Sequence, residues 1–163
     1  DYADSYKIFS RSDLVLEKEL MMINPMEVME GGIAFLSPKY IDVLFDFTKS
    51  GIQEAGIIFH IVQPPKHGKV TIHSYGSESN ASATQMKFFS HIDLTTDKVK
   101  YTHNGAENSN DHMTIDMQIV SANRNHLPKY LEGKHRFVLH VNVTPVNDPP
   151  VLRLPPNKLL RVT

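Results

Sequence analysis

The chain has 163 residues, of which 40% are hydrophobic and 21% are charged, and its formal net charge at pH 7 is -1. These values are ordinary for a folded soluble protein, and the length allows one good core rather than two full domains. The near-neutral charge gives no reason to expect nucleic acid or an anionic membrane surface as a partner. Cysteine is absent, which excludes disulfides and thiolate metal sites.

The beginning of the chain is polar and carries no sustained periodicity. The first residue is Asp1 rather than Met, and no apolar signal stretch follows it, so we expect a piece of a longer protein. Residues 1–19 are predicted to be an incoming linker or the end of a preceding module. From residue 20 apolar residues return, split by Pro25 and by Gly31-Gly32, which favour a turn or a bulge. Ser37-Pro38 is typical of the cap of one short helical turn, which would run to residue 41.

The rest of the chain reads as short strands joined by turns rich in Gly, Pro and Asn. Apolar residues alternate with polar ones, or gather in short runs, in residues 43–47, 57–62, 70–72, 88–89, 92–94, 99–101, 113–119 and 137–143. The last of these is the clearest: alternate residues from Phe137 to Val143 are apolar, and the pattern stops at Pro145. No amphipathic helix of ten or more residues appears. About seven strands without crossover helices predict an all-β, antiparallel sandwich of the immunoglobulin or cadherin-like type, with long polar loops.

An ordered series of short motifs points to a known family. In chain order it runs Met29-Glu-Gly-Gly32, Phe59-His-Ile-Val-Gln-Pro-Pro-Lys-His-Gly68, Val99-Lys-Tyr-Thr-His-Asn-Gly105 with Asp111, and Val143-Thr-Pro-Val-Asn-Asp-Pro-Pro150. Together these resemble the chondroitin sulfate proteoglycan (CSPG) repeat, a cadherin-like module found in arrays in the Fras/Frem basement-membrane proteins and in the neuron-glia transmembrane proteoglycan. The resemblance implies an immunoglobulin-like sandwich, an extracellular location and a role in adhesion and matrix assembly. Residues 20–146 would be the repeat, and residues 147–163 a linker and the start of the next repeat.

The resemblance also raises the question of calcium. Cadherin-type linkers carry Asp-x-Asn-Asp-Asn-x-Pro, whose oxygen ligands bind Ca²⁺ between modules. The matching positions here keep Asn147 and Asp148, while Pro145 and Pro149 replace other ligands, and Glu30 could add a carboxylate. The neighbouring repeat would have to complete the coordination of such a site. The alternative is that Asn147 and Asp148 only cap a turn. No cofactor is required on either reading.

Histidine is frequent, with nine residues, yet the sequence does not predict a zinc site. No His-x-x-x-His pair on a helix and no His-Glu-x-x-His motif is present. We expect His67 and His103 to donate to backbone carbonyls and so to fix their turns. Two sequons, at Asn80 and Asn142, predict N-glycosylation if the protein is secreted. Asn80 lies in a serine-rich loop, and Asn142 should face solvent from the last strand.

The only candidate catalytic group is an acidic cluster of Glu107, Asp111 and Asp116. Paired carboxylates can hydrolyse glycosides, but Asp111 also fits a family position, and no nucleophile motif is present. We therefore expect no enzyme. The favoured function is a spacer and protein-interaction module, with neighbouring repeats and other matrix or cell-surface proteins as partners. The alternative is a ligand-recognition module of a membrane-anchored cell-surface proteoglycan.

Overall fold

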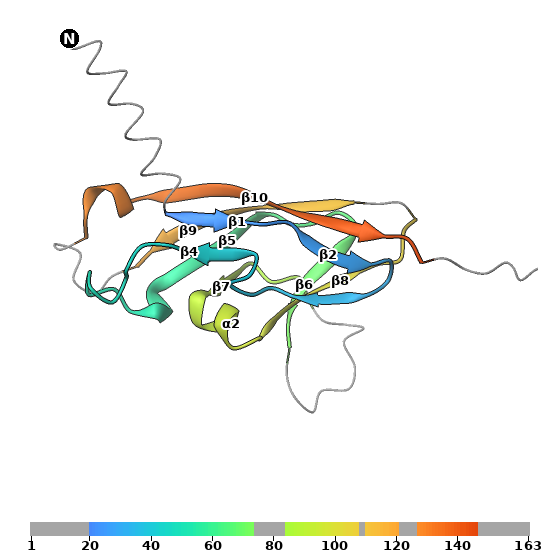
Figure 1. Cartoon of the computed structure of the whole chain (residues 1–163), viewed down its shortest axis with the longest axis horizontal. Coiled ribbons are helices and arrows are strands. Elements are labelled where there is room, and N and C mark those ends of the chain that lie inside the picture. Colours follow the sequence, from blue (N-terminus) through green and yellow to red (C-terminus); the bar gives the residue numbers. More distant parts are fainter. Residues whose placement is uncertain (1–19, 74–83, 108–109, 121–126, 147–163) are drawn as a thin grey trace, which may run out of the picture.

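A computed structural model describes residues 20–73, 84–107, 110–120 and 127–146. Within these residues ten strands, one short α-helix and two 3-10 helices form (Figure 1). The strands are β1 Met21–Ile23, β2 Met26–Met29, β3 Ile33–Phe35, β4 Ile41–Val43, β5 Ile57–Gln63, β6 Gly68–Ile72, β7 Phe88–Ser90, β8 Val99–His103, β9 Asp111–Ile119 and β10 Lys134–Thr144. The helices are η1 Glu54–Gly56, α2 His91–Thr95 and η3 Lys129–Leu131.

The strands form two layers around one core, which confirms the predicted all-β sandwich. One layer is a five-stranded sheet in the order β2-β10-β9-β5-β7, and the other contains a three-stranded sheet, β3-β8-β6, and the pair β1-β4. Side chains from all three sheets share one buried cluster, including Tyr101, Phe59, Ile41 and Met113. All pairs are antiparallel except that of β10 with β2, which is parallel. The sequence did not indicate this one parallel pair, because β2 is a four-residue edge strand with too little pattern to reveal its direction.

The strands β9 and β10 show the alternation that the sequence predicted. In β10, Leu139 and Val141 are fully buried, whereas Val138 and His140 are exposed on the opposite side of the strand. In β9, alternate residues from Met113 to Ile119 are buried. We call the side of the five-stranded sheet that points away from the core the outer face; it carries His60, His112, Asp116, Gln118, Arg136, Val138, His140 and Asn142.

Two segments differ from the predicted strands. Residues 92–94 lie in α2 rather than in a strand, because Ser90 and Asp93 form a reciprocal capping box: Ser90 Oγ accepts from the Asp93 N–H at 3.2 Å, and Asp93 Oδ2 accepts from the Ser90 N–H at 3.1 Å. Residues 43–47 are strand only as far as Val43. The predicted single turn after Ser37 is present, with the N–H groups of Tyr40 and Ile41 both donating to the Ser37 carbonyl.

Candidate functional site

The motifs that are scattered along the sequence meet at one end of the sandwich, where β10 ends. The His103 N–H donates to the Gly32 carbonyl at 2.9 Å, and the Asn104 N–H donates to the His67 carbonyl at 2.8 Å. Figure 1 shows the turn between β2 and β3 at the same end as the C-terminal end of β10. We call this end the exit pole; it comprises residues 29–33, 64–68, 103–106, 110–111 and 143–146.

Asp111 is the centre of the exit pole. The residue is 4% exposed, and its carboxylate accepts four hydrogen bonds. The N–H groups of Lys66 and His112 each donate to Oδ1 at 2.9 Å. The His67 N–H donates to Oδ2 at 2.9 Å, and the Tyr101 hydroxyl donates to the same oxygen at 2.7 Å. One buried side chain therefore ties the turn at residues 64–68 to β8 and β9.

The charge of Asp111 is stabilised by these contacts. Burial alone raises the pKa of the Asp111 carboxyl, but the bonds from Tyr101, Lys66, His67 and His112 outweigh it and lower the pKa below its ordinary value. Burial and the adjacent carboxylate together raise the pKa of the Tyr101 phenol far above its ordinary value. Tyr101 therefore stays protonated and remains a donor.

His103 fixes the turns of the exit pole, but its side chain accepts hydrogen bonds from backbone N–H groups, whereas the prediction was that it donates to backbone carbonyls. Its Nδ1 accepts the N–H of Gly31 at 3.0 Å and the N–H of Gly105 at 3.1 Å. A ring nitrogen that accepts carries no proton, so the proton is on Nε2, which is buried and has no hydrogen-bond partner within the described residues. Both glycines adopt positive φ angles, 73° for Gly31 and 90° for Gly105, a conformation that glycine allows without strain.

Of the three residues predicted to bind calcium, only Glu30 lies within the described residues. Its N–H donates to the Thr144 carbonyl at 2.9 Å, and its Oε1 accepts the Val146 N–H at 3.3 Å. The Glu30 carboxylate therefore lies beside the segment that leads to Asn147 and Asp148, both outside the described residues. No group of three or more His, Asp or Glu side chains is arranged to hold a metal ion in the described ranges.

Of the two predicted glycosylation sites, only Asn142 lies within the described residues. Asn142 is exposed on the outer face, and its Nδ2 lies 3.5 Å from Oε2 of Glu27 on the neighbouring β2. The next residue, Val143, is held by its N–H, which donates to Asn110 Oδ1 at 2.9 Å. Asn80 lies outside the described residues.

The acidic cluster does not form a carboxylate pair. Asp111 points into the core from the start of β9, whereas Asp116, five residues later, lies on the outer face. Asp116 is bound by Arg136, whose Nε and Nη2 donate to the two carboxylate oxygens at 2.8 and 3.1 Å. This hydrogen bond is the main reason that the pKa of Asp116 lies below its ordinary value. Glu107 is exposed, in the loop before β9.

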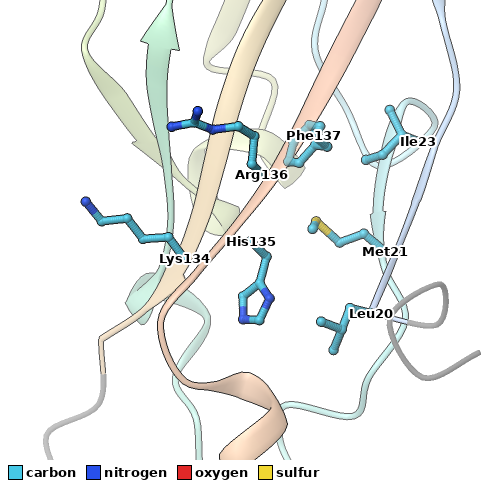
Figure 2. A pocket seen from close by; sticks show the side chains of 7 residues that line it. All are labelled: Leu20, Met21, Ile23, Lys134, His135, Arg136 and Phe137. Carbon is cyan, nitrogen blue, oxygen red and sulfur yellow. The ribbon is translucent and has the colours of Figure 1, made fainter. Parts of the chain in front are cut away.

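A cavity of about 350 Å³ lies between β1 and the first half of β10 and is lined by Leu20, Met21, Ile23, Lys134, His135, Arg136 and Phe137. Figure 2 shows His135 and Phe137 directed toward β1, with Lys134 and Arg136 pointing to the other side of β10. Sequence reasoning missed this cavity. The signal in the sequence was Pro25, which marks the point where the chain changes its pairing partner. Before this proline β1 pairs with β4, and after it β2 pairs with β10.

The described helices offer no membrane span: none has the length and apolar character needed to cross a bilayer.

Comparisons with known proteins agree with the motif series. A family model described as cadherin-like matches residues 19–130. The chain is 27% identical to rat chondroitin sulfate proteoglycan 4 over 142 residues, which is 87% of this chain and 6% of that protein. It is 25% identical to the human form over the same length. It is 34% identical to human FRAS1-related extracellular matrix protein 1 over 131 residues, which is 80% of this chain and 5% of that protein.

The chain thus spans a small part of the curated relatives that it matches. The family match stops at residue 130, but β10 completes the sandwich beyond that point and pairs with both β9 and β2. The family match covers the exit-pole motifs from Met29 to Asp111. Together with the two kinds of relative, it confirms the resemblance to the CSPG repeat. The chain belongs to the cadherin-like family, in the form of the repeat found in chondroitin sulfate proteoglycan 4 and the FRAS1-related matrix proteins.

Proposed function

We propose that residues 20–146 are a non-catalytic, extracellular repeat that acts as a spacer and interaction surface in a tandem array of an adhesion or basement-membrane protein. The observation that carries this proposal is the arrangement of the exit pole. Glu30 ties the departing chain to the turn between β2 and β3, and three large apolar side chains are exposed there: Met29 at 56%, Ile33 at 55% and Val146 at 46%. A following repeat that packs on them would make the array stiff.

The names of the relatives support the location and the class of partner. One relative is named as an extracellular matrix protein and another as a proteoglycan. We infer that the parent protein works outside the cell, whether secreted or membrane-anchored, and contacts matrix or cell-surface proteins. The described carboxylates support the non-catalytic part of the proposal, because Asp111 and Asp116 are each held by their own donors on opposite faces.

The test uses the chain together with the repeat that follows it in the parent protein. Replacing Met29 and Ile33 by Ser should lower the Tm of the following repeat. The same change should increase the flexibility between the two repeats, measured by small-angle X-ray scattering. Ile72→Ser is the matched control, because Ile72 is 48% exposed but lies at the other end of β6, away from the exit pole. Two repeats that unfold independently, with no effect of Met29 or Ile33, would refute the proposed packing.

We further propose that Glu30, Asn147 and Asp148 contribute to a Ca²⁺ site between repeats. Support comes from the position of Glu30, whose carboxylate lies beside the exit segment, and from the oxygen donors that follow. Because Ca²⁺ takes six to eight oxygen ligands, the following repeat must supply the remainder. Melting the two-repeat fragment in Ca²⁺ and in chelator should give a higher Tm in Ca²⁺, and Glu30→Gln should reduce the difference. Equal Tm values in the two conditions would refute the proposed Ca²⁺ site.

The alternative function, a ligand-recognition module of a membrane-anchored proteoglycan, draws on the relationship to chondroitin sulfate proteoglycan 4. A saturable interaction of the single repeat with one defined matrix protein, abolished by substitutions on one face, would favour it over the spacer. We also propose N-linked glycans at Asn80 and Asn142. Mass spectrometry of protein secreted from animal cells tests both, with Asn→Gln at each position as the control.

A further inference from the structure

Two histidines stand directly opposite each other on the outer face. His112 of β9 and His140 of β10 are register partners in an antiparallel pair. Their ring centroids are 5.9 Å apart, with the ring planes inclined at 46°. Both residues are exposed, so the rings are open to solvent.

The backbone places these two rings as close as an antiparallel pair allows. The Val120 N–H donates to the Gly56 carbonyl, and Ile58 and His60 of β5 pair with Gln118 and Asp116. Even-numbered residues of β9 therefore direct their backbone groups toward β5, and odd-numbered residues direct theirs toward β10. His112 and His140 thus face each other at a position without direct backbone bonds, where side chains approach most closely.

Two such imidazoles suit one transition-metal ion. Zinc binds histidine nitrogen at 2.0–2.1 Å, which brings the centroids of two coordinating rings to about 5 Å. Small rotations of the exposed side chains close the difference from 5.9 Å. The backbone needs no change, because β9 lies between β5 and β10, and β10 pairs with both β9 and β2. Nitrogen ligands favour zinc and copper over calcium and magnesium.

We propose that His112 and His140 form a bidentate site for a divalent transition-metal ion of the zinc type on the outer face of the repeat. The protein supplies two ligands, and water or a donor from a binding partner fills the remaining positions. The site is separate from the calcium proposal, which concerns oxygen ligands at the linker. Sequence spacing could not reveal it, because the two histidines are 28 positions apart and only the β9–β10 register brings them together.

The test is a titration of the full 163-residue chain, made without glycans, with Zn²⁺ by isothermal calorimetry. We expect saturable binding of one ion to the wild type at this site, weakened about 100-fold in His112→Ala and in His140→Ala because the chelate is lost. The double variant should lose the site altogether, because each single variant keeps one imidazole ligand and the double variant keeps none.

His60→Ala is the matched control. His60 is on the same face, but its Nε2 lies 3.1 Å from Gln118 Oε1, so its loss should leave the Zn²⁺ affinity unchanged. A second measurement uses Cu²⁺, whose paramagnetism should broaden the amide NMR signals around residues 112 and 140 first. Absence of saturable Zn²⁺ binding, or equal affinity in wild type, His112→Ala and His140→Ala, would overturn the proposal. Neither result would bear on the packing of successive repeats.

Discussion

Among single residues, Asp111 is expected to matter most for stability, because it accepts four hydrogen bonds while nearly fully buried. Asp111→Asn keeps the shape but removes the charge and turns one acceptor into a donor that faces N–H groups. We expect a loss of about 3 kcal/mol in the free energy of unfolding, measured by urea denaturation. Tyr101→Phe removes a single donor and should cost about 1.5 kcal/mol. Equal stability of Asp111→Asn and wild type would contradict this role.

Gly68 is required for a different reason, because the Tyr101 side chain leaves no room for a Cβ at this position. A Cβ at this position would lie 2.5 Å from two ring carbons and the hydroxyl oxygen of Tyr101, and that hydroxyl is held by the Asp111 carboxylate. Gly68→Ala should therefore displace Tyr101 and cost about 1–3 kcal/mol, read from the midpoint of chemical unfolding. Lys66→Ala is the control in the same turn: it keeps the N–H that binds Asp111, so the change should stay within about 0.5 kcal/mol.

Among the elements, β10 gives the sharpest test of the two-layer core. Leu139 is fully buried and Val138 is 39% exposed on the other side of the strand. Leu139→Ala should cost about 2–5 kcal/mol because it leaves a cavity, whereas Val138→Ala should cost under about 1 kcal/mol. Similar losses at the two positions, measured by thermal unfolding, would mean that the strand does not separate core from solvent.

The elements that the sequence predicted well are those with long alternation. β9 and β10 are nine and eleven residues long, so a period of two stands out against chance. Segment 92–94 was misread because three apolar or acidic residues fit a strand as well as a helix. The deciding signal was the pairing of Ser90, just before the segment, with Asp93 inside it, because their spacing matches a capping box with Asp in the place of Glu.

The exit pole was only partly predictable for a related reason. The motifs at Glu30, His67, His103 and Asp111 were recognised one by one, but their contacts join residues that are far apart in the sequence. The Gly31 N–H meets His103 Nδ1 across 72 positions, and the Lys66 N–H meets Asp111 across 45. Such pairings follow from strand register, which the sequence does not state. The sense of the His103 bonds was missed because an imidazole can accept as well as donate.

In the whole molecule, stability in acid depends on two carboxylates on opposite faces of the same strand, β9. Asp111 holds the exit pole together, and Asp116 holds Arg136 across the outer face. The pKa of each lies below the ordinary value of 3.8. A carboxyl with a lowered folded-state pKa contributes stability that is present above the unfolded-state value and is lost as the pH falls through the folded-state value.

Wild-type protein should therefore lose stability as the pH falls from about 5 to about 2, followed by urea unfolding at each pH. Asp111→Asn and Asp116→Asn should both be less stable than wild type at pH 7, but the gap should narrow as the wild-type carboxyls become protonated. Leu139→Ala is the control, because a packing defect carries no proton and its gap should not depend on pH. If the gaps of the two Asp variants stayed as constant as that of Leu139→Ala, the ionised carboxylates could not be what secures these contacts.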